Sequence, residues 1–79
     1  MSPTVLRHKK YRFFFFSLEE KRKHGHASGP DGEAKFWLEP IVSLERHTGL
    51  SAKRLKELQG VVGRKQDEIS RAWDKHFKG

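Results

Sequence analysis

The chain has 79 residues, a formal net charge of +7 and no cysteine. Without cysteine there can be no disulfide, thiolate metal ligand or cysteine nucleophile, and the composition fits a reducing compartment, for which we expect the cytoplasm. No apolar run approaches the roughly 20 residues that a membrane-spanning helix needs, so we expect no membrane partner. A chain of this length is expected to form one domain, residues 1–79, with a marginal core that a homodimer would support.

The positive charge is concentrated in the first part of the chain. Residues 1–30 hold seven Lys or Arg and two Asp or Glu, whereas residues 31–79 hold ten and eight. A positive field attracts phosphates or acidic surfaces. We therefore expect the partner to be either a small acidic protein or RNA.

The start of the chain is predicted to be extended. Residues 1–10 would form a basic N-terminal arm, loose or continuing into a strand. The next segment, "YRFFFFS" (residues 11–17), is rich in aromatic side chains, which have a strong strand preference. Successive phenylalanines must point to opposite faces of the sheet, so this strand is expected to be apolar on both faces.

Two further strands are predicted around a tight turn. "KHGHAS" precedes Pro30 and Gly32, which occupy positions that suit a turn. "AKFWLE" (residues 34–39) alternates and stops at Pro40, which cannot donate to a strand ladder. The prediction is a three-stranded antiparallel sheet over residues 11–40.

The hydrophobic period changes to that of a helix after Ser51. Ser51 suits an N-cap, and the predicted helix covers residues 51–78. Gly60 and Gly63 each cost about 1 kcal/mol relative to alanine, so a kink or split near them is an alternative. Residues 41–49 fit a short helical turn or a strand. The apolar stripe of the helix consists of Leu55, Leu58, Val62, Ile69, Trp73 and Phe77.

The predicted fold is therefore α+β, an antiparallel sheet packed on one face by a long C-terminal helix. Side chains two apart on a strand share a face, so His24 and His26 should point together, opposite the small residues Gly25 and Ala27. We expect the helix to cover the second set together with Phe36 and Leu38. The uncovered face would then carry His24, His26, Lys35, Trp37 and Glu39, together with two aromatic residues of the first strand.

Several segments of the chain resemble a known family. The aromatic first strand, "HGHAS", "AKFWLEP" and the helix end "RAWDKHF" resemble the small bacterial and archaeal family catalogued as domain of unknown function 4160, over about residues 11–77. Family members tend to have prolines before the first histidine and a valine between the two, where this chain has residues 21–23, all cations, and Gly25. The resemblance implies a partner in a two-gene toxin and antitoxin arrangement, often with another small uncharacterised domain, and no established activity.

The favoured interpretation is a non-enzymatic protein-interaction module of such a gene pair. Arg22, Lys23 and Lys35 would supply positive charge for an acidic partner or for phosphate. Tyr11 and Trp37 would form an aromatic platform.

One alternative is a toxin that binds or cleaves RNA. Cleavage without a metal needs a base, an acid and cations around the developing phosphorane charge. His24 and His26 could transfer protons, because histidine titrates near neutral pH. The same cations would then contact phosphate, and the aromatic platform would stack bases.

A further alternative is a metal-binding domain. His24 and His26 could share a zinc ion, with Glu39 as a third ligand or with Glu45 and His47 as other candidates. A structural zinc site takes four protein ligands, and none of these residues has a characteristic spacing. We therefore expect no cofactor, with zinc as the alternative to test.

Overall fold

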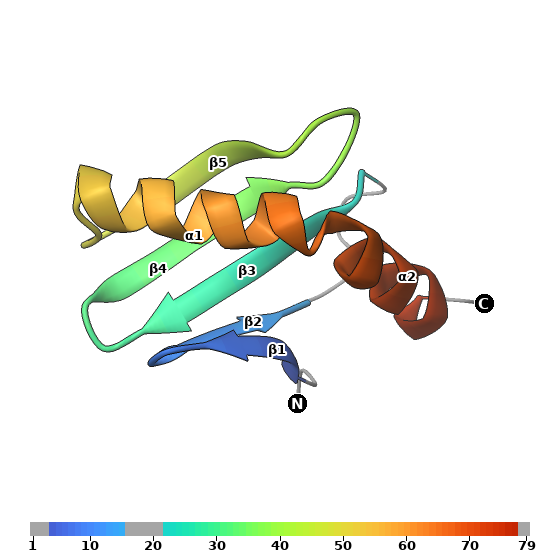
Figure 1. The fold of residues 1–79 in the computed structure, drawn as a ribbon, viewed down its shortest axis with the longest axis horizontal. Helices are drawn as coiled ribbons and strands as arrows, with labels where there is room; N and C mark the ends of the chain where they lie inside the picture. Colours follow the sequence, from blue (N-terminus) through green and yellow to red (C-terminus); the bar gives the residue numbers. More distant parts are fainter. Residues whose placement is uncertain (1–3, 16–21, 78–79) are drawn as a thin grey trace.

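The computed structural model describes residues 4–15 and 22–77, and within this part of the chain five strands and two helices form. The fold is α+β, as predicted: one antiparallel sheet, in the order β1-β2-β3-β4-β5, with α1 across one face and α2 near the end where β3 begins (Figure 1). Neither of the described helices combines the length and apolar character that a membrane crossing requires. The strands are β1 (Thr4–His8), β2 (Tyr11–Phe14), β3 (His24–Gly29), β4 (Gly32–Trp37) and β5 (Ser43–Thr48), and the helices are α1 (Ala52–Arg64) and α2 (Gln66–His76).

The core lies between the sheet and the helices. Phe13, Ala27 and Ala34 pair across β2, β3 and β4, and all three are buried. Because paired residues share a face, this row marks the side of the sheet that α1 covers. Phe36 and Leu38 are also buried, so the predicted helix-covered set is confirmed at these positions. The helices contribute Leu58, Val61, Val62, Ile69 and Trp73 to the same cluster.

Thr4–His8 form the strand β1 of the sheet, whereas the predicted three-stranded sheet began only at residue 11. β1 pairs with β2, and Val5 and Leu6 pack against the core. The two strands are joined at Lys9, whose φ of 56° lies in the left-handed region that lysine seldom adopts. A turn without glycine or asparagine leaves little sequence signal, which is why the hairpin was missed.

The segment left open between strand and helical turn is the fifth strand, β5. It pairs with β4, but the register shifts between Lys35 and Phe36. Lys35 pairs with Arg46 and Phe36 pairs with Leu44, so Glu45 is an extra residue between the two pairs. An extra residue of this kind breaks the two-residue alternation by which a strand is recognised. The sheet therefore has five strands, not three.

The C-terminal segment forms two helices, so the prediction of one long helix over residues 51–78 is wrong and the alternative of a split near Gly60 and Gly63 is the one that the structure follows. α1 begins at the predicted N-cap, where the Ser51 side chain accepts a hydrogen bond from the Arg54 backbone amide at 3.1 Å. The break lies at Lys65, with φ −105° and ψ 14°, two residues beyond Gly63. Of the other predicted boundaries, Phe16, Ser17 and Lys78 fall outside the described residues.

The position of the break follows from contacts at the start of α2. The Gln66 side chain donates to the Leu38 carbonyl at 2.9 Å and so ties α2 to the end of β4. Asp67 and Glu68 occupy the first turn of α2, where negative charge is favourable to a new helix N-terminus. The change of direction brings Trp73 onto Phe15, with ring centroids 5.3 Å apart. A straight helix could not make both sets of contacts.

Trp73→Ala should lower the free energy of unfolding by about 3–5 kcal/mol, because it removes a large buried side chain that joins α2 to the sheet. The measurement is urea denaturation followed by circular dichroism. Trp73→Phe should lose less, and Arg71→Ala, an exposed position on the same helix, should stay within about 0.5 kcal/mol. Equal stability of the Trp73→Ala and Arg71→Ala variants would contradict this account of how α2 is held.

Candidate functional site

The sheet face opposite α1 carries a row of four directly paired side chains. Phe14 on β2, His26 on β3, Lys35 on β4 and Arg46 on β5 are successive partners in the register. They alternate with the buried row that faces the helix, so all four lie on the other side. We call this side the open face and define it by Arg12, Phe14, His26, Lys35, Trp37 and Arg46, together with Arg22, whose guanidinium lies over Trp37.

The aromatic rings of the open face are in contact with cations. The Arg12 guanidinium lies 4.5 Å from the centre of the Phe14 ring, which also stacks with His26 at 5.5 Å between centroids. The Trp37 ring has the Arg22 guanidinium at 4.3 Å and the Lys35 ammonium at 4.7 Å from its centre. These distances are within the range of cation–π attraction, so the rings position the positive groups.

The structure separates the two histidines, which corrects the prediction that both lie on the uncovered face. His26 is half-buried there, but His24 is only 3% exposed. Its ring lies 5.0 Å from that of Trp73, and its Nδ1 is 2.8 Å from the Arg22 carbonyl oxygen. The reason is the turn between the helices, because α2 passes the end of the sheet and Trp73 covers His24. Strand alternation alone does not reveal this.

Lys23 and Glu39 also take local structural contacts. The Lys23 ammonium donates to the Ser70 hydroxyl at 2.9 Å and pairs with Asp74 at 2.8 Å, so it ties α2 to the start of β3. The Glu39 carboxylate accepts from the Lys23 backbone amide at 3.4 Å. Of the three predicted anion-binding cations, Arg22 and Lys35 therefore lie beside Trp37, whereas Lys23 is turned towards the helix.

The predicted zinc ligands do not come together. Within residues 4–15 and 22–77, no three or more histidine or acidic side chains are grouped closely enough to hold a metal ion. The rings of His24 and His26 are 5.5 Å apart and nearly perpendicular, at 81°. Two rings at this distance could approach one ion, so it is the lack of a third ligand beside them among the described residues that gives no support to a site built from these two histidines and Glu39.

Tyr11, the other half of the predicted aromatic platform, is only 3% exposed and is separated from Trp37. Tyr11 lies two residues before Phe13 on β2, so its side chain points to the same, helix-covered side of the sheet. Its hydroxyl donates to Asp31 at 2.5 Å, and the Arg54 guanidinium lies 5.3 Å from the ring centre. Burial, followed by the hydrogen bond to Asp31, raises the pKa of the Tyr11 hydroxyl. Tyr11 is thus a core residue.

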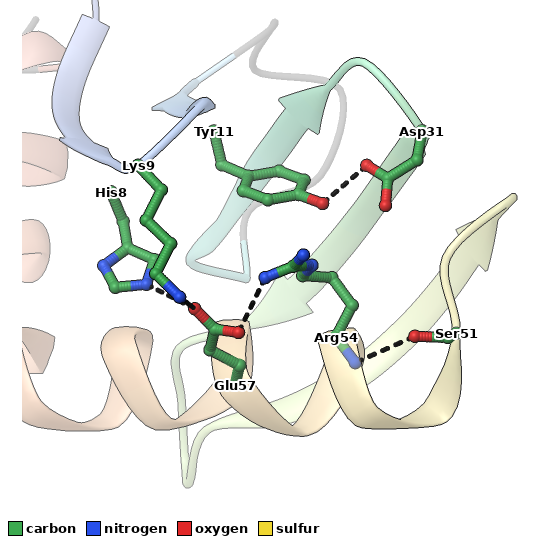
Figure 2. Close-up of polar contacts among 7 residues, drawn as sticks. All are labelled: His8, Lys9, Tyr11, Asp31, Ser51, Arg54 and Glu57. Carbon is green, nitrogen blue, oxygen red and sulfur yellow. Dashed lines mark hydrogen bonds and ion pairs between the residues drawn. The ribbon is translucent and has the colours of Figure 1, made fainter.

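A second polar cluster, centred on Glu57 of α1, fixes the first hairpin to the helix (Figure 2). The Glu57 carboxylate lies 2.7 Å from the His8 ring nitrogen and 2.8 Å from the Lys9 ammonium, and it accepts from Arg54 at 2.8 Å. Hydrogen bonds from Lys9, then from His8, lower the pKa of Glu57 from 4.5 to about 2. These residues come from two separate parts of the chain, the first hairpin and α1. Arg54 and Glu57 are three residues apart on the helix, but no sequence spacing connects Glu57 with His8 and Lys9.

The sequence reasoning missed Arg12 and Arg46 of the open face, and it expected two aromatics of the first strand there without specifying Phe14. Arg12 and Phe14 lie two residues apart on β2 and so share a face. The predicted antiparallel sheet makes β2 a neighbour of β3, and a register between these strands would have put both residues on the face of His26. Arg46 could not have been placed in this way. Its strand was left open, and the register shift at Glu45 reverses the expected face of the residues beyond it.

Glu57→Gln should destabilise the protein at neutral pH, and the difference from the wild type should shrink as the pH falls from about 4.5 to about 2. The pKa of Glu57 is lower in the folded state, so its stabilising effect is present above the unfolded pKa and is lost on protonation. Urea unfolding midpoints across this pH range provide the measurement. Glu33→Gln removes one exposed carboxylate from β4 as the control, and a Glu57→Gln difference that is constant with pH would contradict the prediction.

The comparisons with known proteins concern the whole chain and its family. No curated protein and no solved structure matches it. The family model described as "Domain of unknown function (DUF4160)" matches residues 11–74, which include β2 to β5, α1 and most of α2. The match covers most of the 79 residues and confirms the resemblance drawn from the histidine and "KFWLEP" segments. The chain therefore belongs to the DUF4160 family of domains of unknown function.

Proposed function

We propose that the chain is a non-enzymatic interaction module whose open face binds an acidic protein partner. The observation that carries the proposal is the contact of Arg12 with Phe14 and of Arg22 and Lys35 with Trp37. Aromatic rings that hold cations at the surface restrict their side chains before a partner arrives, and this reduces the entropy lost on binding. The partner best suited to such a surface presents carboxylates.

The same contacts favour a protein partner over RNA. Proteins that bind single-stranded nucleic acid stack bases on exposed aromatic side chains. Here the Trp37 ring is engaged by Arg22 and Lys35, and the Phe14 ring by Arg12 and His26. A base that stacked on either ring would have to displace one of these groups. Recognition by charge needs no such displacement.

The position of His24 argues against RNA cleavage by the histidine pair. An acid and a base must both reach the reacting phosphate. His26 is half-buried on the open face, whereas His24 is buried against Trp73. The Nδ1 atom of His24 is also within hydrogen-bond distance of the Arg22 carbonyl oxygen. Cleavage would require His24 to leave its buried position, whereas a binding module requires no such change. The geometry therefore favours the binding module.

The toxin and antitoxin setting comes from the family resemblance, and the proposed partner is the protein encoded beside this chain. We expect the two to act in the cytoplasm, which the lack of cysteine favours. In this setting the open face would be the surface that joins the two products. Its positive charge would speed their association, because complementary fields steer diffusional encounter.

Charge reversal on the open face should disrupt the complex with the product of the adjoining gene. The double variant Arg22→Glu, Arg46→Glu should weaken the dissociation constant about a hundredfold in calorimetry, because like charges across an interface cost several kcal/mol. Lys56→Glu with Arg71→Glu makes the same change of charge on exposed helix positions and should bind like the wild type. A complex that tolerates the open-face reversal would contradict the proposal.

Induced expression of the chain alone should leave bacterial growth unchanged, because the proposed function includes no cleavage of cellular RNA. The measurement compares the wild type, His26→Ala and the double variant His24→Ala, His26→Ala at matched levels of soluble protein. His26→Ala is included because it leaves the buried His24 in place. Growth arrest by the wild type that His26→Ala abolishes would favour the RNA-directed toxin instead.

A further inference from the structure

Two adjoining hollows lie where the turn between β1 and β2 meets the start of α1. One, of about 400 Å³, is lined by Lys9, Lys10, Asp31 and Arg54 among others, and the second, of about 280 Å³, by Lys9, Lys53, Arg54 and Glu57 with Ser51. Because Lys9 and Arg54 line both hollows, the two lie side by side, at the cluster drawn in Figure 2. We call this surface the basic corner and define it by Lys9, Lys10, Lys53 and Arg54.

Positive charge exceeds negative charge at the basic corner. Of the described residues that line the two hollows, four are Lys or Arg and two, Asp31 and Glu57, are acidic. Both carboxylates already have partners in the chain, because Asp31 accepts from the Tyr11 hydroxyl and Glu57 binds Lys9 and Arg54. The corner therefore keeps an excess of positive charge.

This excess is carried by Lys10 and Lys53. Both residues are exposed, and within residues 4–15 and 22–77 neither side chain forms an ion pair or a hydrogen bond. Lys9 differs from them, since its ammonium lies 2.8 Å from the Glu57 carboxylate. Lys10 and Lys53 are thus the two cations of the corner that a ligand from solution can reach without breaking an existing contact.

The position of Lys53 also favours an anionic ligand. Lys53 and Arg54 stand in the first turn of α1, which holds no acidic residue, and positive charge is unfavourable at a helix N-terminus. Arg54 is compensated, because its Nη1 donates to Glu57 at 2.8 Å and its guanidinium lies 5.3 Å from the centre of the Tyr11 ring. No side chain in the described part of the molecule does the same for Lys53. An anion beside Lys53 would.

A nucleic-acid backbone suits the basic corner better than a protein does. Protein interfaces bury aromatic and apolar side chains at their centre and are poor in lysine. Tyr11 at the corner is buried, and the one large apolar side chain found exposed among the described residues is Ile41, between β4 and β5. Exposed lysines without an apolar centre are typical of contacts with phosphates, which depend on charge.

We infer that the basic corner is a second binding site, which takes the phosphate backbone of a nucleic acid and is separate from the open face. Lys10 contacts a phosphate in one hollow and Lys53 a phosphate in the other. Arg54 lies between them and can donate through Nη2, which has no acceptor in the described part of the chain. The inference goes beyond the proposed function, because an acidic partner on the open face and a nucleic acid at this corner occupy different surfaces.

The test is a fluorescence-anisotropy titration of the full chain into short oligouridylate and oligodeoxyuridylate of equal length. Lys10→Gln with Lys53→Gln should weaken binding about tenfold at about 0.15 M salt, because it removes two phosphate contacts. The slope of the logarithm of the binding constant against that of the salt concentration should fall by about 1.4, since each contact with a single strand contributes about 0.7. The oligomer that is bound more tightly identifies RNA or DNA as the source of the phosphates.

Two control variants separate local contacts from overall charge. Lys10→Arg with Lys53→Arg keeps both charges and should bind like the wild type. Arg71→Gln with Lys75→Gln removes two charges from exposed positions on α2. This pair should also bind like the wild type, because at about 0.15 M salt exposed charges more than about 8 Å apart are largely screened. Equal urea unfolding midpoints for all variants show that the differences arise from binding.

Several results would overturn the inference. No binding of either oligomer at about 0.15 M salt would remove the site, and equal weakening by the two glutamine pairs would show diffuse attraction only. Competition by a blocked glutamate peptide as strong as that by the oligomers would indicate a carboxylate ligand. Loss of binding in Arg22→Glu with Arg46→Glu, but not in Lys10→Gln with Lys53→Gln, would place the nucleic acid on the open face. Only this last result would also contradict the proposed function.

Discussion

The packing of α1 against one face of the sheet is the constraint from which the candidate site follows. Leu58 and Val62 are buried in the same cluster as Phe36 and Ala27, so the strand side chains that alternate with this row point away from α1. His24 is the exception in exposure, because Trp73 of α2 covers it. The open face has no covering helix among the described residues (Figure 1). The polar and aromatic residues that a core would exclude are gathered there as a consequence. The arrangement is the usual one for an antiparallel sheet with a single buried face.

The open face is not a simple solvated surface, because its charges and rings are paired with each other. A solvated lysine extends into water, whereas Lys35 lies against Trp37 and is nearly buried. Arg12 and Arg22 also lie over rings. The side chains are thereby held in a limited set of positions, and this is the basis of the proposed recognition of an acidic partner.

The two helices have different roles in this arrangement. α1 completes the core and is fixed to the first hairpin through Glu57 (Figure 2). α2 closes the end of the sheet, with Trp73 over His24 and with Lys23 bound to Asp74. The contact with Trp73 buries His24. The two histidines of the His-x-His segment are therefore divided between the core and the open face.

The sequence by itself determined the α+β class and the family. It also determined the strand that contains Phe36 and Trp37, where apolar and polar residues alternate clearly, and the start of α1 at Ser51. These features depend on local periodicity and capping, which involve neighbouring residues only. Tertiary structure decided between a strand and a helical turn for β5, decided that the helix breaks and that the break lies at Lys65, and buried His24. Each of these depends on contacts between residues distant in the chain, and their free energy outweighs local preference without leaving a periodic signal.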